Sequence, residues 1–480
     1  MFKKTTSYFL ILLLLSDIGY SFVQHLSMPL DGDMAGGIVP GNGVAQIFKD
    51  PFGVSVITKN AIYPNPNRFF AHLTFYEYFN YIPGFLQRFV NPIDSIYLSC
   101  ALAKIAIQIA FIVLFSFYIT GKRKIFNNDF LLSAILIVPL FQTNGYRSYM
   151  GIIDPSITYT FFYALPCAIL LLIYLPFFRC YFYDSVFPSN KFILFIIFAS
   201  TIFITLNGPL VPGIVLVIFL VLIFNLSMKG ETISRGAVFQ KLSLDFMKAS
   251  KTPLIFFGII GVLSLYSLYI GSNNAIFLND SIPISQRYIR IPLGIYTILT
   301  QKIGFPVLLL MILINAVLIY KYFKNDEGAK ILNIMKCIGL FSFLYIILLP
   351  LGGYKSYRPN IVRYDTIIPI TIALIFFYGK STFFIMHILS GKSKFWYVFL
   401  VFSFSALFTL SDKPEFKKNE CEKAALNKIA ITNERVVLIN SECSVLSWGE
   451  IKNPIESDLN SQLLIKWKVI NEKKLYYWKF

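Results

Sequence analysis

Apolar runs of roughly 15–20 residues recur along nearly the whole chain, and this repetition constrains the fold more than any other feature. A helix needs about 20 predominantly apolar residues to cross the hydrocarbon core of a bilayer. We therefore predict an all-α polytopic membrane protein with about eleven transmembrane helices. The predicted spans cover 5–23, 97–120, 130–141, 158–178, 192–206, 209–228, 253–270, 305–320, 337–351, 366–378 and 395–410.

Charged residues are sparse, and basic residues outnumber acidic ones. They make up 14% of the chain, against about 25% in a soluble domain, and the formal net charge is +18. In a soluble protein this excess would suggest a nucleic-acid partner. Here the lysines and arginines cluster in short loops that the predicted spans place on one side of the membrane. We therefore assign those loops to the cytoplasm and expect no nucleic-acid partner.

The N-terminus falls on the cytoplasmic side by the same rule, because Lys3 and Lys4 precede the first apolar run. That run resembles a signal peptide, but no small-x-small cleavage site follows it, so we predict an uncleaved first span. An odd number of spans then leaves the C-terminal end outside. The expected location is the plasma (inner) membrane of a cell envelope, crossed many times.

Two polar regions complete the predicted domain plan. The transmembrane domain, 1–410, contains a long first extracytoplasmic loop, 25–96, whose aromatic runs predict short interfacial helices. The remaining segment, 411–480, has the composition of a small extracytoplasmic α/β module, called the C-terminal module below. Within it, the patterns predict a helix over 424–431 and strands over 435–440 and 463–470.

Cysteine usage gives a single indication of compartment. Cys421 and Cys443 are the two cysteines of the C-terminal module, and they could pair if the module lies outside the cytoplasm.

The most acidic and glycine-rich stretch follows the first span, where Gly32 separates Asp31 and Asp33. At the outer membrane surface, a carboxylate can act as a general base. The competing interpretation is an exposed turn, since Asp-Gly is a favoured turn pair. Asp17 lies inside the first span, where a carboxylate is costly, and we expect it to support the site from within the membrane or to pair with a neighbouring helix.

Basic residues and tyrosines gather in the later outer loops, where cations are usually sparse. A guanidinium binds phosphate oxygens through paired hydrogen bonds, so these loops predict an anionic, phosphate-bearing ligand. The competing interpretation is contact with lipid headgroups. The candidate phosphate-binding residues are Arg147, Arg287, Arg290, Lys355, Tyr357, Arg358 and Arg363.

Taken with Leu30-Asp-Gly-Asp33, this architecture resembles the C-type (GT-C) integral membrane glycosyltransferases. Members of that superfamily have a first span, a long outer loop with an acidic motif near its start, many further spans and an outer C-terminal module. The resemblance implies transfer of a sugar from a polyprenyl-phosphate donor to an acceptor at the outer face, with Asp31 or Asp33 as the base. It leaves open a glycan, lipid or protein acceptor, and it leaves open a divalent metal cofactor.

Two other functions remain open from the sequence alone. One is a surface-polysaccharide polymerase, which would also carry large outer loops rich in arginine. The other is a flippase or transporter of a lipid-linked or small solute, a class in which broken spans and mid-membrane charges are common.

Overall fold

The computed structural model describes residues 2–122, 124–125, 127–143, 150–227, 252–278, 282–353, 356, 358, 360–440 and 442–478. Eight helices in these ranges are long and apolar enough to cross a membrane, so the chain is a multi-pass membrane protein. They are α1 (Phe2–Leu26), α6 (Pro92–Thr120), α8 (Ile157–Tyr159) continued through a π-helical turn into α9 (Leu165–Tyr183), α13 (Thr252–Ser272), α17 (Gly304–Tyr322), α18 (Asp326–Leu348), α19 (Ile368–Ile388) and α20 (Gly391–Ser411).

Three of the predicted spans are not full-length, straight transmembrane helices. The segment predicted at 130–141 is α7 (Asn128–Ile137) with a short 3-10 turn, which is shorter than a full crossing. The predicted hairpin after residue 191 is a pair, α10 (Lys191–Thr205) and α11 (Leu210–Ser227), bent by 111° at a short break. A count of eleven spans is therefore not confirmed.

The break between α10 and α11 has a local cause and a tertiary one. Gly208 has a positive φ of 106°, which favours glycine, and the following proline cannot donate the next helical hydrogen bond. The start of α5 holds the break, because Gly208 N donates to Asn67 O and Phe70 N donates to Leu206 O.

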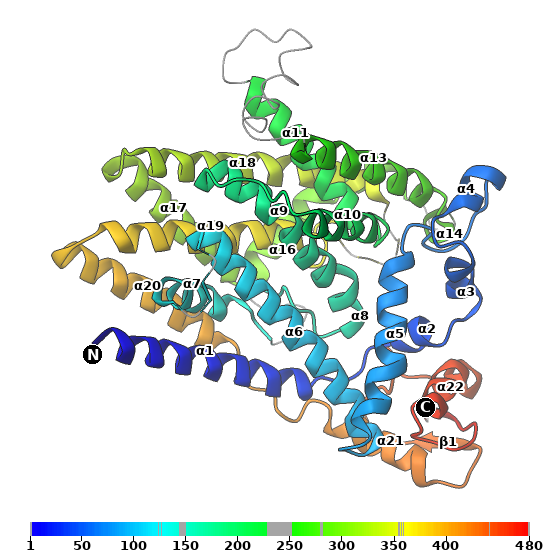
Figure 1. Ribbon diagram of the computed structural model, residues 1–480. Coiled ribbons are helices and arrows are strands. Elements are labelled where there is room, and N and C mark those ends of the chain that lie inside the picture. Colours follow the sequence, from blue (N-terminus) through cyan, green and yellow to red (C-terminus); the bar gives the residue numbers. More distant parts are fainter. Residues whose placement is uncertain are drawn as a thin grey trace.

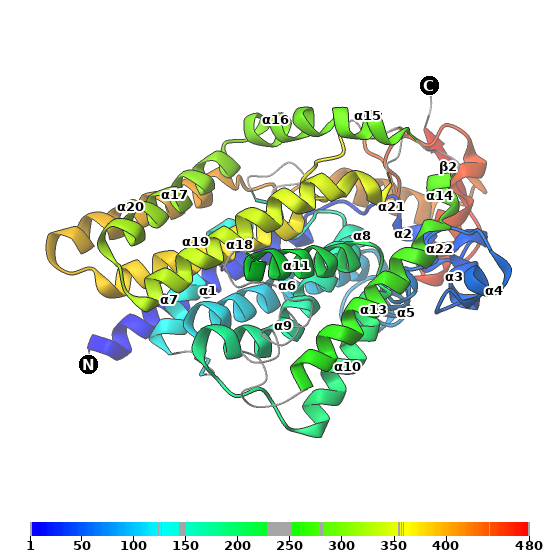
Figure 2. The ribbon, with the colours of Figure 1, turned by 90° about the horizontal axis from the view of Figure 1, so that it is seen from above.

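The first loop contains four helices: α2 (Met34–Ile38), α3 (Asn42–Lys49), α4 (Val54–Lys59) and α5 (Phe69–Leu86). The aromatic run assigned by sequence to the headgroup region is internal in part, since Phe75 and Phe79 of α5 are fully buried whereas Tyr81 is exposed. A second departure is α15 (Ile284–Ile289) with α16 (Ile291–Gln301), which lie along one side of the bundle where we expected a loop (Figure 2).

The C-terminal module is a small α/β unit with α21 (Glu420–Ile431), β1 (Val436–Ile439), α22 (Asp458–Lys466) and β2 (Leu475–Trp478). The two strands are parallel, with Val436 opposite Leu475. The helix over 424–431 and the strand over 435–440 are confirmed, and Cys421 and Cys443, whose pairing the sequence left open, form a disulfide.

The strand predicted over 463–470 is wrong. The segment Leu463–Lys466 is the last turn of α22, and Leu463, Leu464 and Trp467 are buried on one side of it. Lys468, with a positive φ of 57°, then turns the chain towards β2. Apolar residues at these positions suit a strand or a helix, and packing against α2 and α5 decides between them.

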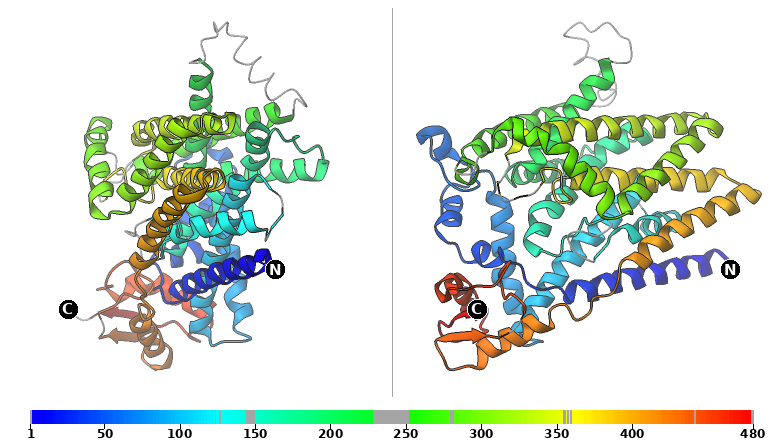
Figure 3. Two further views of the ribbon diagram at one scale, coloured as in Figure 1. Left: turned by 90° about the vertical axis from the view of Figure 1, so that its left-hand side faces the viewer. Right: turned by 180° about the vertical axis from the view of Figure 1, so that it is seen from behind.

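One apolar core joins the C-terminal module to the first loop. Ile38, Phe75 and Phe79 share a cluster with Leu464 and Trp467. The first loop and the module therefore lie at the same end of the helical bundle, called the loop end below (Figures 1 and 3). The N-terminus and the α19–α20 turn lie at the opposite end, called the N-terminal end (Figure 1).

Candidate active site

Asp31 is a buried carboxylate, 4% exposed, with hydrogen bonds to both oxygens. Its Oδ2 accepts from Ser156 Oγ at 2.8 Å and from Thr158 N at 3.0 Å. Its Oδ1 accepts from Thr158 Oγ1 at 2.8 Å and from Asp33 N at 3.0 Å. Burial raises the pKa of Asp31, although the bonds from Thr158 and Ser156 oppose the shift. Asp31 therefore joins the first loop to the start of α8.

Asp33 is exposed and begins α2. Its backbone N–H is held by Asp31, but among the described residues no group donates a hydrogen bond to its carboxylate. The two aspartates, equivalent in sequence, thus differ in surroundings: Asp31 is enclosed and engaged, whereas Asp33 faces solvent. Only Asp33 presents its carboxylate to an incoming molecule.

Tyr159 of α8 is the point where three distant segments meet. Arg358, from the loop before α19, donates from Nη2 to the Tyr159 hydroxyl at 2.9 Å. Trp448 of the C-terminal module stacks on the Tyr159 ring, with centroids 5.9 Å apart and planes 24° apart. Asp33 is near enough to interact electrostatically with the Tyr159 hydroxyl. Tyr159 is therefore bonded to Arg358, stacked on Trp448 and within electrostatic range of Asp33.

More cations lie one helical turn further along, around Tyr163. Its hydroxyl interacts electrostatically with Arg68, Arg358 and Arg363. Arg363 forms a bidentate ion pair with the buried Asp365, with Nε–Oδ1 at 3.0 Å and Nη2–Oδ2 at 2.9 Å. That pairing fixes the guanidinium of Arg363, whereas Arg358 bonds to the Tyr159 hydroxyl and Arg68 lies over an aromatic ring.

Arg68 starts α5 and lies over the ring of Phe162, 5.5 Å from its centroid. His72, one turn later, is buried against the same ring, and burial together with Arg68 lowers its pKa to about 3. Within the described chain, neither ring nitrogen of His72 has a hydrogen-bond partner, and neither has the side-chain amide of the buried Asn207. Neutral polar groups are thus gathered beside a cation at the α10–α11 break.

A buried cation that the sequence analysis did not identify supports the site from α6. Lys104 is 1% exposed, and its ammonium donates to the carbonyl of Pro155 and interacts electrostatically with Asp154. Asp154 accepts from Ser156 N at 2.8 Å, and burial raises the pKa of Asp154 well above its ordinary value. A lone lysine within an apolar run was the available signal, since charges in spans are candidate functional groups.

Glu422 of α21 fastens the C-terminal module to the first loop. It accepts from Leu30 N at 2.8 Å, from the Tyr97 hydroxyl at 2.8 Å and from Leu446 N at 3.2 Å. Burial raises the pKa of Glu422 to about 7. No local pattern distinguishes this glutamate from the others of α21, so the sequence held no signal for it.

The predicted phosphate-binding residues do not form one group. Arg147, Lys355 and Tyr357 lie outside the described residues. Arg287 donates to the carbonyls of Ile282 at 2.7 Å and Pro350 at 3.0 Å, so it ties α15 to the end of α18.

Arg290 lies at the junction of α15 and α16 and is half-buried. Of the predicted cations, Arg358 and Arg363 are those that the structure brings to the surroundings of Tyr159 and Tyr163.

Asp17 lies near a residue at the end of a neighbouring helix and not near Asp31 or Asp33. It interacts electrostatically with Asp412, at the end of α20, whose Oδ2 accepts from Thr143 N at 3.0 Å and Thr143 Oγ1 at 2.8 Å. The nearby Tyr20 hydroxyl donates to the Asp412 carbonyl. Asp17 thus belongs to the contact between α1 and α20.

An apolar cavity of about 330 Å³ lies between α16, α17, α18 and α19. Its size falls in the range of roughly 300–1,000 Å³ that is usual for ligand pockets. Val362 and Ile367 are part of its wall, and Arg363 and Asp365 lie between them in the chain. The cavity therefore extends along the helices from the neighbourhood of the Arg363–Asp365 pair.

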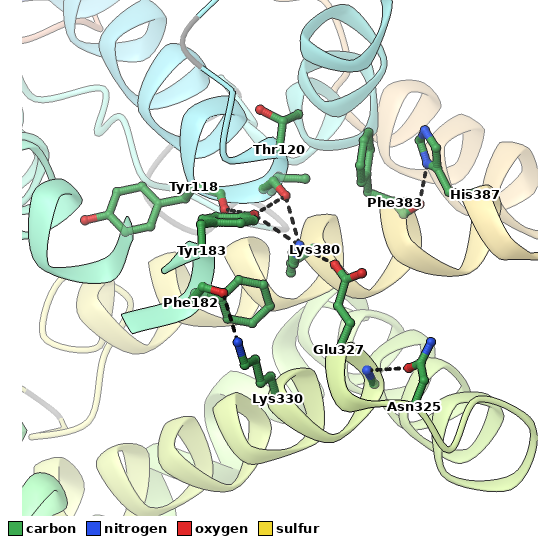
Figure 4. Close-up of polar contacts among 12 residues, drawn as sticks. Tyr118, Thr120, Phe182, Tyr183, Asn325, Glu327, Lys330, Lys380, Phe383 and His387 are labelled. Carbon is green, nitrogen blue, oxygen red and sulfur yellow. Dashed lines mark hydrogen bonds and ion pairs between the residues drawn. The ribbon is translucent and has the colours of Figure 1, made fainter. Parts of the chain in front are cut away.

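The N-terminal end holds a separate polar cluster around Lys380 of α19 (Figure 4). Its ammonium, 3% exposed, donates to Ile119 O at 3.2 Å, to the Tyr183 hydroxyl at 3.1 Å and to Glu327 Oε1 at 3.3 Å. It also lies 4.5 Å from the centroid of the Phe182 ring. The cluster joins α6, α9, α18 and α19 around a buried ammonium.

A metal ion shared between the two aspartates does not fit this geometry. Both oxygens of Asp31 already accept two hydrogen bonds each, which leaves no lone pair directed at a shared cation. Among the described residues, no group of three or more histidine, cysteine, aspartate or glutamate side chains could hold a metal.

Comparison with protein-family models, curated proteins and solved structures found no match. The GT-C resemblance therefore stays a prediction drawn from the sequence.

Proposed function

We propose that this protein is a membrane glycosyltransferase that transfers a sugar from a polyprenyl-phosphate donor to an acceptor at the outer face of the plasma membrane. The observation that carries the proposal is that Tyr159 accepts a hydrogen bond from Arg358 and lies within electrostatic range of the exposed Asp33. An accessible carboxylate and a guanidinium around one tyrosine suit a reaction that needs a base for the acceptor and a cation for a departing phosphate.

In the proposed reaction, the acceptor hydroxyl attacks the anomeric carbon of the donor sugar while Asp33 takes its proton. The bond between the anomeric carbon and the phosphate oxygen breaks, and the polyprenyl phosphate leaves with the electron pair. Arg358 stabilises the charge that develops on the phosphate, because a fixed guanidinium needs no reorganisation as the bond breaks. Asp31 is a positioning residue, since its Oδ1 accepts from the backbone N–H of Asp33.

The apolar cavity between α16 and α19 suits the polyprenyl chain. Its wall carries almost no polar surface, and it reaches Val362, next to the Arg363–Asp365 pair. A lipid in the cavity would thus bring its phosphate to the level of Arg363, with Arg358 and Arg68 nearby. In this arrangement, the loop end is the outer face, which agrees with the disulfide of the C-terminal module.

The test is sugar transfer in membranes that contain a radiolabelled polyprenyl-phosphate sugar. We expect Asp33→Asn to lower the transfer rate by about 10²–10⁴-fold, the usual contribution of a positioned base. Glu450→Gln, which removes an exposed carboxylate from the C-terminal module, is the matched control and should transfer normally. Full activity of Asp33→Asn at wild-type expression would overturn the proposal.

A flippase for a lipid-linked solute is the second candidate, favoured by the α10–α11 pair bent by 111°. Broken helices of this kind form substrate sites in transporters. Reconstituted vesicles with a fluorescent polyprenyl-phosphate sugar and an acceptor distinguish the two. A flippase moves the intact lipid-linked sugar between leaflets, whereas a transferase passes the sugar to the acceptor, releases fluorescent polyprenyl phosphate and leaves the sidedness of the lipid unchanged.

A further inference from the structure

Trp448 is an exposed aromatic side chain that the fold nevertheless holds in place. Its exposed fraction is 59%, although it belongs to a polar loop of the C-terminal module and not to a lipid-facing helix. The mechanism proposed above gives it no role.

Three restraints fix the loop that carries Trp448. The Cys421–Cys443 disulfide ties the start of the loop to α21, and Leu446 N donates to the buried Glu422 at 3.2 Å. The Trp448 backbone then passes directly over Gly32. A Cβ at position 32 would lie 2.6 Å from Trp448 N and 2.7 Å from Cδ1, so the contact requires glycine there.

The ring of Trp448 lies against the residue that precedes the candidate base in the chain. It stacks on Tyr159, and the residue beneath it, Gly32, is the chain neighbour of Asp33. Trp448 and Tyr159 together are called the stacking platform below.

We propose that the stacking platform binds a sugar ring of the acceptor, and that the acceptor is therefore a glycan rather than a protein or a lipid. A pyranose presents aliphatic C–H groups on one face, and these match the negative face of an aromatic ring. A ring seated on Trp448 would direct its hydroxyls towards Asp33. A protein acceptor would need a groove with backbone donors and acceptors, which a restrained aromatic surface does not supply.

The inference rests on the proposed function for the role of Asp33, but its first test does not depend on transfer. Purified protein in lipid nanodiscs is titrated with maltoheptaose, chitohexaose and mannohexaose, and binding is followed by saturation-transfer NMR and calorimetry. We expect the wild type to bind at least one of these, Trp448→Ala to bind it at least tenfold more weakly, and Trp448→Phe to retain most of the affinity.

Matched variants separate stacking from misfolding. Trp396→Ala removes a tryptophan of similar exposure on α20 and should bind as the wild type. Gly32→Ala should reproduce the loss in Trp448→Ala, because the added methyl group displaces the Trp448 backbone. The proposal is overturned if the wild type binds none of the three glycans, or if Trp448→Ala binds them as the wild type does.

The second test identifies the acceptor class from the labelled product. With a glycan acceptor, the transferred sugar appears in a water-soluble, protease-resistant fraction. Trp448→Ala should then raise the acceptor KM at least tenfold while release of the sugar to water is unchanged. Label in a protease-sensitive or lipid fraction overturns the glycan assignment but leaves the transferase proposal intact. Glycan binding with no transfer by the wild type overturns the transferase proposal and leaves the stacking platform as a binding site.

Discussion

The two ends of the bundle hold charged side chains in different ways. At the N-terminal end, Lys380 is enclosed by Glu327, Tyr183 and Phe182, and its partners come from helices that it holds together (Figure 4). At the loop end, Asp33 is exposed, and no described residue donates to its carboxylate, although its own backbone is firmly held. A charged side chain that is bound entirely by other protein groups stabilises the fold. A charged side chain that is held in place but still exposed to solvent can bind a ligand.

The largest expected effect is on activity and follows from substituting Asp33. In the part of the chain that the structure describes, no residue donates a hydrogen bond to the Asp33 carboxylate. We therefore expect Asp33→Asn to leave the thermal midpoint unchanged while it lowers the transfer rate by about 10²–10⁴-fold. Measuring both quantities on the same membranes tests the comparison directly. A large fall in the thermal midpoint would mean that Asp33 fastens the fold as Lys380 does.

Glu422 gives the next effect, a dependence of stability on pH. Burial raises its pKa from 4.5 to about 7, so the folded protein binds more protons than the unfolded chain between these values. Protonation of Glu422 therefore adds to the free energy of unfolding below pH 4.5, and this contribution is lost as the pH rises through 7. At 1.36 kcal/mol per pKa unit, the loss is up to about 3 kcal/mol.

The measurement is the thermal midpoint of the C-terminal module between pH 5 and pH 8, with the disulfide intact. We expect the wild-type midpoint to fall across this range and that of Glu422→Gln to stay level. Glu420→Gln, an exposed neighbour on the same helix, should keep the wild-type slope. A wild-type midpoint that does not change with pH would contradict burial of Glu422 between the module and the first loop.

Substitution of Lys380 should have a smaller effect, confined to stability. Lys380→Met removes an ammonium that serves several acceptors and leaves the partly exposed Glu327 to solvent, so we expect a loss of about 2 kcal/mol. Lys330→Met is the matched control at the same end, because the pair of Lys330 with Asp184 is exposed and should contribute about 0–1 kcal/mol.

Chemical denaturation of the detergent-solubilised variants measures these losses, and the transfer assay checks that activity per folded molecule is retained. If Lys380→Met abolished transfer while remaining as stable as the wild type, the N-terminal end would also be a functional site. That result would support the flippase alternative, because transporters use charged side chains within the membrane for their function.

Much of the fold was predictable because it depends on local pattern. Each predicted apolar segment coincides with a helix, since length and composition alone decide whether a segment can be stable in lipid. The short α7 and the bent α10–α11 pair were taken for full spans, because apolar content does not reveal a change of direction. The prediction of a strand over 463–470 was wrong for a similar reason. Its apolar residues fit both the two-residue repeat of a strand and the 3.6-residue repeat of a helix, and packing favoured the helix.

The candidate site was predictable in part. The acidic stretch after the first span and the basic loop before α19 stood out by composition, and Arg358 and Asp33 both interact with Tyr159. Lys104 carried a signal that was overlooked. Glu422 and Trp448 carried none, because their roles depend on contacts with residues several hundred positions away in the chain.

Length, composition and the order of residues are enough to identify a helical membrane protein with an acidic loop after its first helix. Which aspartate is enclosed and which is accessible depends instead on contacts between distant segments. That choice depends on Ser156 and Thr158 reaching Asp31, and on the C-terminal module covering Gly32. Identical side chains acquire different chemistry when distant segments surround one and leave the other open.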